Sequence, residues 1–426
     1  MITAVPERPR LRLIEALRES SPPSPPSPPA QEVRQATTRR QRVLRAQRDV
    51  GMLIGTTGLL CLLGLVMVLV ASTAASLADY GSPWSIFERQ AFYMAGGLVA
   101  LVVGMRIPTQ FWRRVRLLML AGGFGLLVIV LVPGIGHTAG GSSRWVGAGL
   151  FRVQPSELMK FALVVFAADL VARREQGLDT WHRQWSELVR PLGVIVLTAA
   201  GLILAQPDMG TAVVLCCIAF GVLYAGGVRM GLLTGSFCAA AGTAVLWSLS
   251  KPYQRQRLLS FLDPVQHLTS GGYQSVQGFA ALQSGGISGS GLGTSGAGWG
   301  YLPNAHTDFI FAVIGGQLGL LGAVAVIALV GLFAWFGFRV AARTTDRFSS
   351  LLAFGITCWI LSQAVINIGA VTGMLPVTGI PLPFVSYGGS ALVVAMLATG
   401  ILIGIGRRNV TEAFEAGRRP PRRRPR

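Results

Sequence analysis

Charged residues are scarce in this chain, and lysine is the scarcest of them. Only 13% of the 426 residues are charged, and lysine occurs twice, at Lys160 and Lys251. By contrast, 51% of the residues are hydrophobic. A water-soluble domain of this size could not bury so much apolar surface behind so few charges, so the composition excludes a soluble globular protein. The sequence predicts an all-α polytopic membrane protein.

Cysteine pairs with metal-ligand or disulfide spacing are also missing. The five cysteines lie inside apolar runs, without a CxxC pair or a nearby histidine. We interpret them as small buried hydrophobic residues, and we predict no metal site built from protein side chains. The polar, Arg-rich first 48 residues do not have the pattern of a signal peptide.

Acidic residues are outnumbered 18 to 37 by lysine and arginine, which gives a net charge of +19. Much of the excess lies near the two ends of the chain, where anionic lipid headgroups are the expected partner and nucleic acid is not. We expect a disordered, basic, Pro-rich cytoplasmic tail over 1–49, a transmembrane domain over 50–408, and a disordered Arg-rich cytoplasmic tail over 409–426.

Apolar runs recur along the transmembrane domain. Arg-rich connections alternate with Gly-, Ser- and Pro-rich ones, and the positive-inside rule assigns the Arg-rich connections to the cytoplasm. We therefore expect about ten transmembrane helices, both termini in the cytoplasm, and a large extracytoplasmic loop between helices 7 and 8. The expected spans are about 51–76, 91–104, 117–132, 156–171, 191–205, 211–226, 230–249, 309–338, 348–370 and 389–405, of which the fourth is the least clear.

The large loop, 251–308, holds two acids and enough glycine and serine to predict a soft backbone. Asp308 directly precedes an apolar run. It could cap the next helix, which is the commoner role for an aspartate in that place. It could also be a general base, because partial desolvation raises a carboxyl pKa toward neutrality. Asp263 precedes a proline. It is either a residue of a turn or a second candidate for the general base.

Glu157 and Lys160 lie three residues apart, so a helix would place them on one face. They could form a structural ion pair, or Lys160 could face a polar cavity that receives an anionic headgroup. Arg144, in the preceding loop, could join that cavity. In QPDMGT, Asp208 is expected to cap the following helix.

The segment 373–390 contains too many prolines and glycines for a straight helix. Non-helical backbone at membrane depth is tolerated where it is buried in protein or lines a cavity. The segment is therefore either a re-entrant connector or one wall of the cavity, with Ser386 and Tyr387 as polar groups.

Several motifs together resemble the FtsW/RodA family, the SEDS (shape, elongation, division and sporulation) proteins. The resemblance covers about 50–408, with the motifs in matching order. It implies ten transmembrane helices and a peptidoglycan glycosyltransferase that polymerises lipid II at the outer face of the bacterial cytoplasmic membrane. It also implies a class B penicillin-binding protein as the partner transpeptidase. The motifs are GGSSRWVGAGLFRVQPSELMK, QPDMGTAVV, GGYQSVQGFAALQSGG, LPNAHTDFIFA and NIGAVTGMLPVTGIPLPFVSYGGSA.

The resemblance implies that Asp308, the acid of HTDF, is the catalytic residue. Lys160, Arg144 and Arg257 are then expected to stabilise the departing undecaprenyl pyrophosphate. The full set of expected substrate-binding residues is Arg144, Glu157, Lys160, Arg257, Asp263, Gln277, Ser386 and Tyr387. The chain departs from the family pattern at Asn304, Gly316 and Gln317, where acids are usual, and at Gly278, where serine is common.

The expected substrates are lipid II and an undecaprenyl-pyrophosphate-linked glycan. A divalent cation, Mg or Mn, carried by the substrate pyrophosphate is the one cofactor considered. Two other functions stay open on the sequence: a lipid II flippase, and a non-catalytic scaffold for the penicillin-binding protein. The sequence does not separate elongation from division.

Overall fold

The computed structural model describes residues 30–134, 136–139, 142–147, 149, 152–174, 180–250, 252–267, 271–293 and 302–415. Most of both predicted tails, 1–29 and 416–426, lies outside the described residues, and so does Lys251. The expectation that those tails are disordered therefore stays a prediction.

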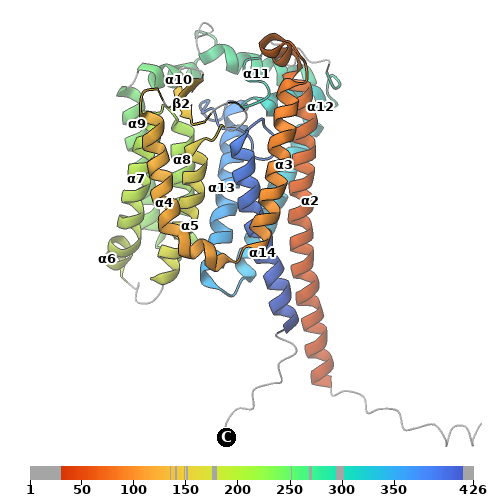
Figure 1. Cartoon of the computed structure of the whole chain (residues 1–426), viewed down its shortest axis with the longest axis vertical. Coiled ribbons are helices and arrows are strands. Elements are labelled where there is room, and N and C mark those ends of the chain that lie inside the picture. Colours follow the sequence, from red (N-terminus) through yellow and green to blue (C-terminus); the bar gives the residue numbers. More distant parts are fainter. Residues whose placement is uncertain are drawn as a thin grey trace, which may run out of the picture.

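The described chain is a bundle of long, roughly parallel helices with one small β-hairpin (Figure 1). The hairpin and two short helices gather at one end, which we call the loop end. The helices are α2 (Ala30–Tyr80), α3 (Ser85–Arg106), α4 (Thr109–Leu131), α5 (Pro155–Arg173), α6 (Trp181–Gln184), a π-turn (Trp185–Val189), α7 (Arg190–Ala205), α8 (Met209–Ala225), α9 (Met230–Ser250), α10 (Pro252–Leu262), α11 (Gly271–Gly285), α12 (Ile310–Arg343), α13 (Arg347–Val371) and α14 (Ser390–Glu415). The hairpin pairs β1 (His137–Ala139) with β2 (Ser142–Trp145) antiparallel.

Seven helical segments in the described part of the chain are long and apolar enough to cross a membrane. Each of the ten expected spans falls on a helix, but α8 and α9 have shorter apolar stretches and α5 carries buried charges. The all-α membrane fold is confirmed, and the number of crossings stays a prediction. The seven segments are Arg40–Tyr80, Ser85–Arg106, Thr109–Leu131, Trp181–Ala205, Ile310–Arg343, Arg347–Val371 and Ser390–Glu415.

The core of the bundle is formed by α13 and α14, whose apolar windows are 67% and 83% buried. Helix α14 packs closely against α3 because small residues face each other at the crossing. A Cβ added to Gly400 would overlap the Leu101 carbonyl oxygen. Such contacts between small residues let helix backbones approach inside a membrane.

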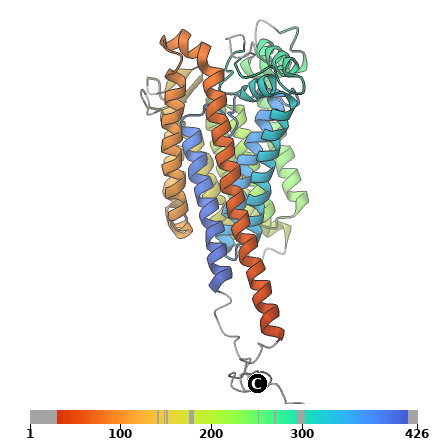
Figure 2. The same cartoon turned by 90° about the vertical axis from the view of Figure 1, so that its right-hand side faces the viewer.

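The helices extend further than predicted at the end opposite the loop end, which we call the basic end. Helix α2 begins at Ala30, inside the tail expected over 1–49, and α14 continues to Glu415. Both project beyond the bundle (Figure 2). Arg113, Arg114 and Arg116, expected in a loop, lie on α4. Hydropathy locates only the apolar part of a helix, whereas Arg, Ala and Gln continue helices well into the polar layer.

The large loop is more ordered than its composition predicted. Its described part contains α10 and α11, and α11 packs against α12. Helix α12 has a kink at Gly319, where φ is 69°. A Cβ there would overlap the backbone nitrogen of Gly289. Only glycine permits both that conformation and that close approach, so the kink fixes the loop to the bundle.

Candidate active site

Asp308 lies at the loop end, in a turn segment directly before α12, and its side chain is partly exposed. It does not cap that helix. The cap position is Phe309, and no side chain makes a capping hydrogen bond there. The commoner role expected from spacing is therefore not observed, which leaves the carboxylate available for another function.

The Asp308 carboxylate and the Arg144 guanidinium both lie close to Gly379, on the connector between α13 and α14. A Cβ added to Gly379 would lie 3.5 Å from Asp308 Oδ2 and 3.8 Å from Arg144 Nη1. The connector has a φ of +72° at this position, which favours glycine. Gly379 thus provides both the turn and the space between the two charged groups.

Arg144, on β2, is held by the turn before α8. Its Nε donates to the Gln206 carbonyl at 3.2 Å, and its Nη2 donates to the Pro207 carbonyl. Asp208 then caps α8, accepting from the Thr211 backbone nitrogen at 3.1 Å. The predicted capping role of Asp208 is confirmed, and the cap positions the turn that orients Arg144.

The electrostatic environment of Asp308 suits a general base. Burial raises the pKa of Asp308 to about 6, Arg144 and Arg257 oppose this rise, and Asp208 adds to it. Desolvation is thus stronger than the attraction of two cations. A carboxyl group with this pKa is ionised at neutral pH and still has useful affinity for a proton, which is what general base catalysis needs.

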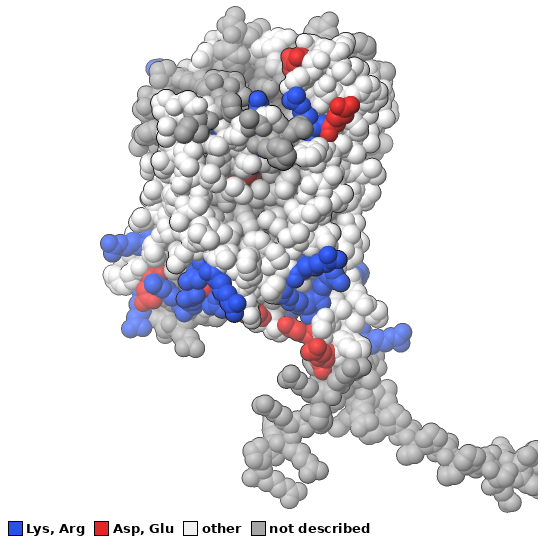
Figure 3. Space-filling model, in the orientation of Figure 1, with Lys and Arg blue, Asp and Glu red and all other residues white. Residues whose placement is uncertain are grey.

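Arg257, on α10, lines a pocket of about 140 Å³ between α10, α11 and the connector. The positive charge of Arg257 lowers the pKa of Asp308, against the effect of burial. The other polar residues of the pocket lining are Gln256, Ser260, Gln274 and Ser275. Figure 3 shows a few acidic atoms deep in the surface below the loop end. An anionic substrate group that enters this pocket would meet the positive charge of Arg257.

Asn367, on α13, was not identified from the sequence, yet it fixes the backbone of the site. Its Nδ2 donates to the carbonyl of Asp308 at 2.8 Å and to the carbonyl of Ile380 at 2.7 Å. One amide group therefore ties the turn that carries the carboxylate to the connector that carries Gly379. The asparagine of the NIGAVTG motif was visible in the sequence, but nothing local indicated its partners.

The predicted pair of Glu157 and Lys160 forms, but it lies below the site. Lys160 Nζ is 2.7 Å from Glu157 Oε1 and 2.9 Å from Gln363 Oε1, and the side chains of Lys160 and Glu157 are 0% and 2% exposed. Gln363 Nε2 also donates to the Pro381 carbonyl at 3.2 Å. The ion pair is enclosed and supports the connector from beneath, and the expectation that these two residues bind substrate stays a prediction.

Three other expected site residues have structural roles. Asp263 Oδ1 accepts from the Gln266 backbone nitrogen at 3.2 Å, which makes it a turn residue. Ser386 is buried, and its hydroxyl accepts from the Leu382 backbone nitrogen at 2.8 Å. The Tyr387 nitrogen donates to the His306 carbonyl at 2.9 Å, which joins the connector to the turn before α12. Gln277 lies partly buried on α11.

Within the described residues, no group of three or more His, Cys, Asp or Glu side chains comes together as a metal site. Asp308 and Asp208 lie close enough to affect each other, and Arg144 and Arg257 add positive charge beside Asp308. Asp208 already uses both carboxylate oxygens in its cap. This donor set does not fit a metal ion held by the protein alone.

Comparison with known proteins gives consistent matches over most of the chain. Residues 51–411 match the FtsW/RodA/SpoVE family model, described as "Cell cycle protein". A Mycobacterium tuberculosis protein named "Probable peptidoglycan glycosyltransferase FtsW" is 41% identical over 88% of this chain and 71% of its own length. "Stage V sporulation protein E" of Bacillus subtilis is 37% identical over 84% and 96%. A chain from a solved peptidoglycan synthase complex, described as coordinating polymerization and crosslinking, superposes with a TM-score of 0.67 at 28% identity, covering 84% of this chain and 97% of that one.

Proposed function

Because the chain belongs to the FtsW/RodA/SpoVE family of cell cycle proteins, we propose that it is a peptidoglycan glycosyltransferase that polymerises lipid II into glycan strands. One observation carries the proposal. A partly exposed carboxylate with a raised pKa, Asp308, lies beside the Arg144 guanidinium at a glycine that leaves room between them. The relatives named FtsW favour a role in cell division over elongation.

In the proposed reaction, the 4-hydroxyl of the acceptor N-acetylglucosamine attacks the anomeric carbon of the donor N-acetylmuramic acid. Asp308 accepts the hydroxyl proton as the new glycosidic bond forms. The bond from the anomeric carbon to the pyrophosphate breaks, and its electron pair leaves with undecaprenyl pyrophosphate. Arg144 and Arg257 stabilise that departing charge. No general acid is required, because a pyrophosphate leaves as an anion.

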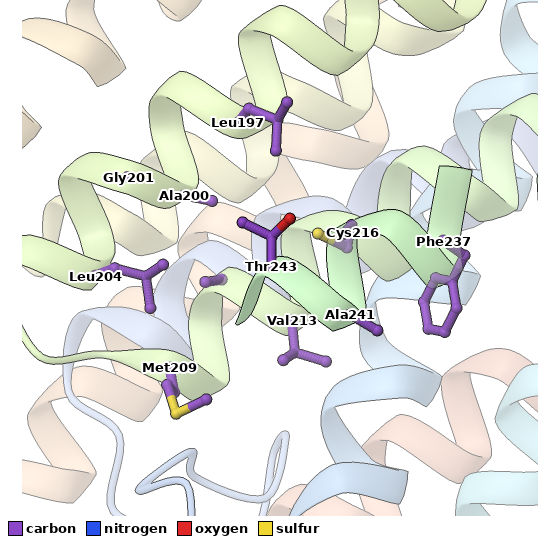
Figure 4. A pocket seen from close by; sticks show the side chains of 12 residues that line it. Leu197, Ala200, Gly201, Leu204, Met209, Val213, Cys216, Phe237, Ala241 and Thr243 are labelled. Atoms are coloured by element: carbon purple, nitrogen blue, oxygen red, sulfur yellow. The ribbon is translucent and has the colours of Figure 1, made fainter. Parts of the chain in front are cut away.

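The lipid tail of the substrate has a suitable surface close by. An apolar pocket of about 230 Å³ lies between α7, α8 and α9 (Figure 4). Met209, at one end of its lining, follows Asp208 in the turn that holds Arg144. A neighbouring pocket of about 320 Å³ shares residues with it and extends toward Arg190. A polyprenyl chain lying there would keep its pyrophosphate near Arg144.

A divalent cation, if one takes part, would arrive with the substrate pyrophosphate, since the protein donors do not fit a site of their own. No step of the proposed reaction passes through it.

We place the protein in the bacterial cytoplasmic membrane with the basic end in the cytoplasm. Lysine and arginine side chains collect at that end (Figure 3), as the positive-inside rule requires. Both termini are then cytoplasmic, and Asp308 faces outward, where lipid II is polymerised. The partner would be a class B penicillin-binding protein, an expectation supported by the similarity to a chain of a synthase complex.

The decisive experiment is polymerisation of lipid II by the purified full-length protein, with and without its penicillin-binding partner. Asp308→Asn keeps the shape of the side chain and removes the base, so it should abolish polymerisation. Asp263→Asn is the matched control, because that carboxylate belongs to a turn, and it should retain activity. A correctly inserted Asp308→Asn protein that polymerises at the wild-type rate would refute the assignment.

The same preparation separates the two other functions. A flippase reconstituted in liposomes would translocate lipid II without forming polymer. A scaffold would do neither, and its Asp308→Asn variant would still bind the penicillin-binding protein and support crosslinking by it.

A further inference from the structure

A second cluster of charges lies at the basic end, remote from the proposed active site. It centres on Asp169 of α5, whose side chain is 2% exposed. Three arginines pair with this one carboxylate. Arg113 Nε lies 2.6 Å from Oδ1, Arg116 Nε lies 2.5 Å from Oδ2, and Arg173 Nε lies 2.8 Å from Oδ2. We call these four residues the Asp169 cluster.

All three arginines contact the carboxylate through Nε. Arg116 Nη1 donates to the Arg113 carbonyl at 2.8 Å. The Arg113 guanidinium also lies over the Phe348 ring at 5.5 Å, which fixes its plane. Among the described residues, Asp169 is the only acid that pairs with these arginines, so three positive charges face one negative charge. The cluster therefore has a surplus of two positive charges.

The position of the cluster indicates which anion can reach it. On α4, several of the exposed side chains beside it are apolar: Phe111, Leu117 and Leu118 are 45%, 57% and 74% exposed. Such residues face lipid tails in a membrane protein. Arg113 and Arg173, with side chains 37% and 50% exposed, lie where this surface becomes basic. That boundary is the level of the phospholipid headgroups.

We propose that the Asp169 cluster is a binding site for the phosphate of an anionic phospholipid. Guanidinium groups bind phosphate through paired N–H donors, and here the exposed parts of Arg113 and Arg173 are accessible to one. The buried carboxylate holds the three guanidiniums in place before the lipid arrives, which lowers the entropic cost of binding. A lipid phosphate is present at this level at high local concentration. The site is independent of the polymerisation chemistry at the loop end.

The test uses the purified full-length protein in nanodiscs of phosphatidylcholine containing 0–30% phosphatidylglycerol, followed by native mass spectrometry of the retained lipid. The wild type should retain phosphatidylglycerol in preference to phosphatidylcholine. Arg113→Gln should reduce this retention about tenfold, the effect expected when a hydrogen bond to a charged group is removed. Asp169 keeps two partners in this variant, so the fold should persist.

Arg114→Gln is the matched control. Arg114 is exposed on the same helix and carries the same charge, but it is not paired with Asp169. Its substitution should reduce retention less than about twofold, because only the general surface field changes. Equal losses from the two variants would overturn the proposal, and so would a wild type that shows no preference for phosphatidylglycerol.

A final arm distinguishes a lipid from a free anion. Inorganic phosphate is added to the protein in detergent, and its effect on the melting temperature is compared with that of phosphatidylglycerol. The lipid should stabilise the wild type more strongly, and Arg173→Gln should diminish that effect. If inorganic phosphate alone gives the full stabilisation, the cluster is a site for free phosphate and the lipid assignment is wrong.

Discussion

The enclosed ion pair of Glu157 and Lys160 gives the sharpest test of the structure, through Lys160→Met. In the wild type, Lys160 Nζ contacts the Glu157 carboxylate at 2.7 Å and Gln363 Oε1 at 2.9 Å, with no exposed surface. Methionine fills much of the same volume but leaves the carboxylate without a counter-ion. Breaking a buried pair in this way costs about 3–5 kcal/mol of the free energy of unfolding.

The double variant Glu157→Gln with Lys160→Met separates structure from catalysis. Removing both charges is often neutral, because neither ion is left unpaired in the interior. Gln363 Oε1 also accepts from Trp359 Nε1 at 3.0 Å, so it keeps a hydrogen-bond partner when the ammonium is removed. The double variant should therefore recover most of the stability that the single variant lacks, and it should polymerise lipid II at close to the wild-type rate.

The assay is thermal unfolding in nanodiscs, followed by intrinsic fluorescence, together with lipid II polymerisation at a temperature where all three proteins are folded. The reasoning fails if the double variant is as stable as the wild type and yet inactive, because Lys160 would then act on the substrate. It also fails if Lys160→Met alone leaves the melting temperature unchanged.

Three further predictions concern the site itself. Because burial raises the pKa of Asp308 from 3.8 to about 6, kcat/KM should rise with pH through about 6, and Asp308→Asn should remove this dependence. The folded protein binds that proton more tightly than the unfolded chain does, so the contribution of Asp308 to the free energy of unfolding should fall as the pH rises from about 4 to 6. A wild-type kcat/KM that does not change with pH would contradict the base assignment. Gly379→Ala introduces a Cβ 3.5 Å from Asp308 Oδ2 at a φ of +72°, which adds about 1–2 kcal/mol of backbone strain. Polymerisation should fall strongly, while the size-exclusion profile stays that of the wild type. Unchanged activity would show that the substrate does not use the space beside Gly379. Asn367→Asp removes the amide that donates to the carbonyls of Asp308 and Ile380, and each carbonyl left without a donor costs about 1–3 kcal/mol of stability. We expect kcat to fall more than KM rises. A change in KM alone would assign Asn367 to substrate binding.

The sequence was sufficient for the membrane class and the positions of the helices, and it identified Asp308 as the candidate base. Hydropathy summed over some twenty neighbouring residues is a local property, so each expected span falls on a helix. Asp308 was identified because an acid against an apolar run stands out, and because the motifs around it resemble a known family. The cap at Asp208 was equally local, since it depends on residues three positions apart.

Only the tertiary structure decided which polar residues meet. Asn367 is one asparagine in an apolar helix, and its two acceptors lie 59 and 13 residues away along the chain. The sequence left open whether Lys160 faces a cavity or the protein interior. In the structure it contacts Gln363, which is 203 residues away along the chain, and it lies in the interior. Helix periodicity records which side chains share a face, but it does not record which other helix covers that face. That information exists only once the bundle has packed.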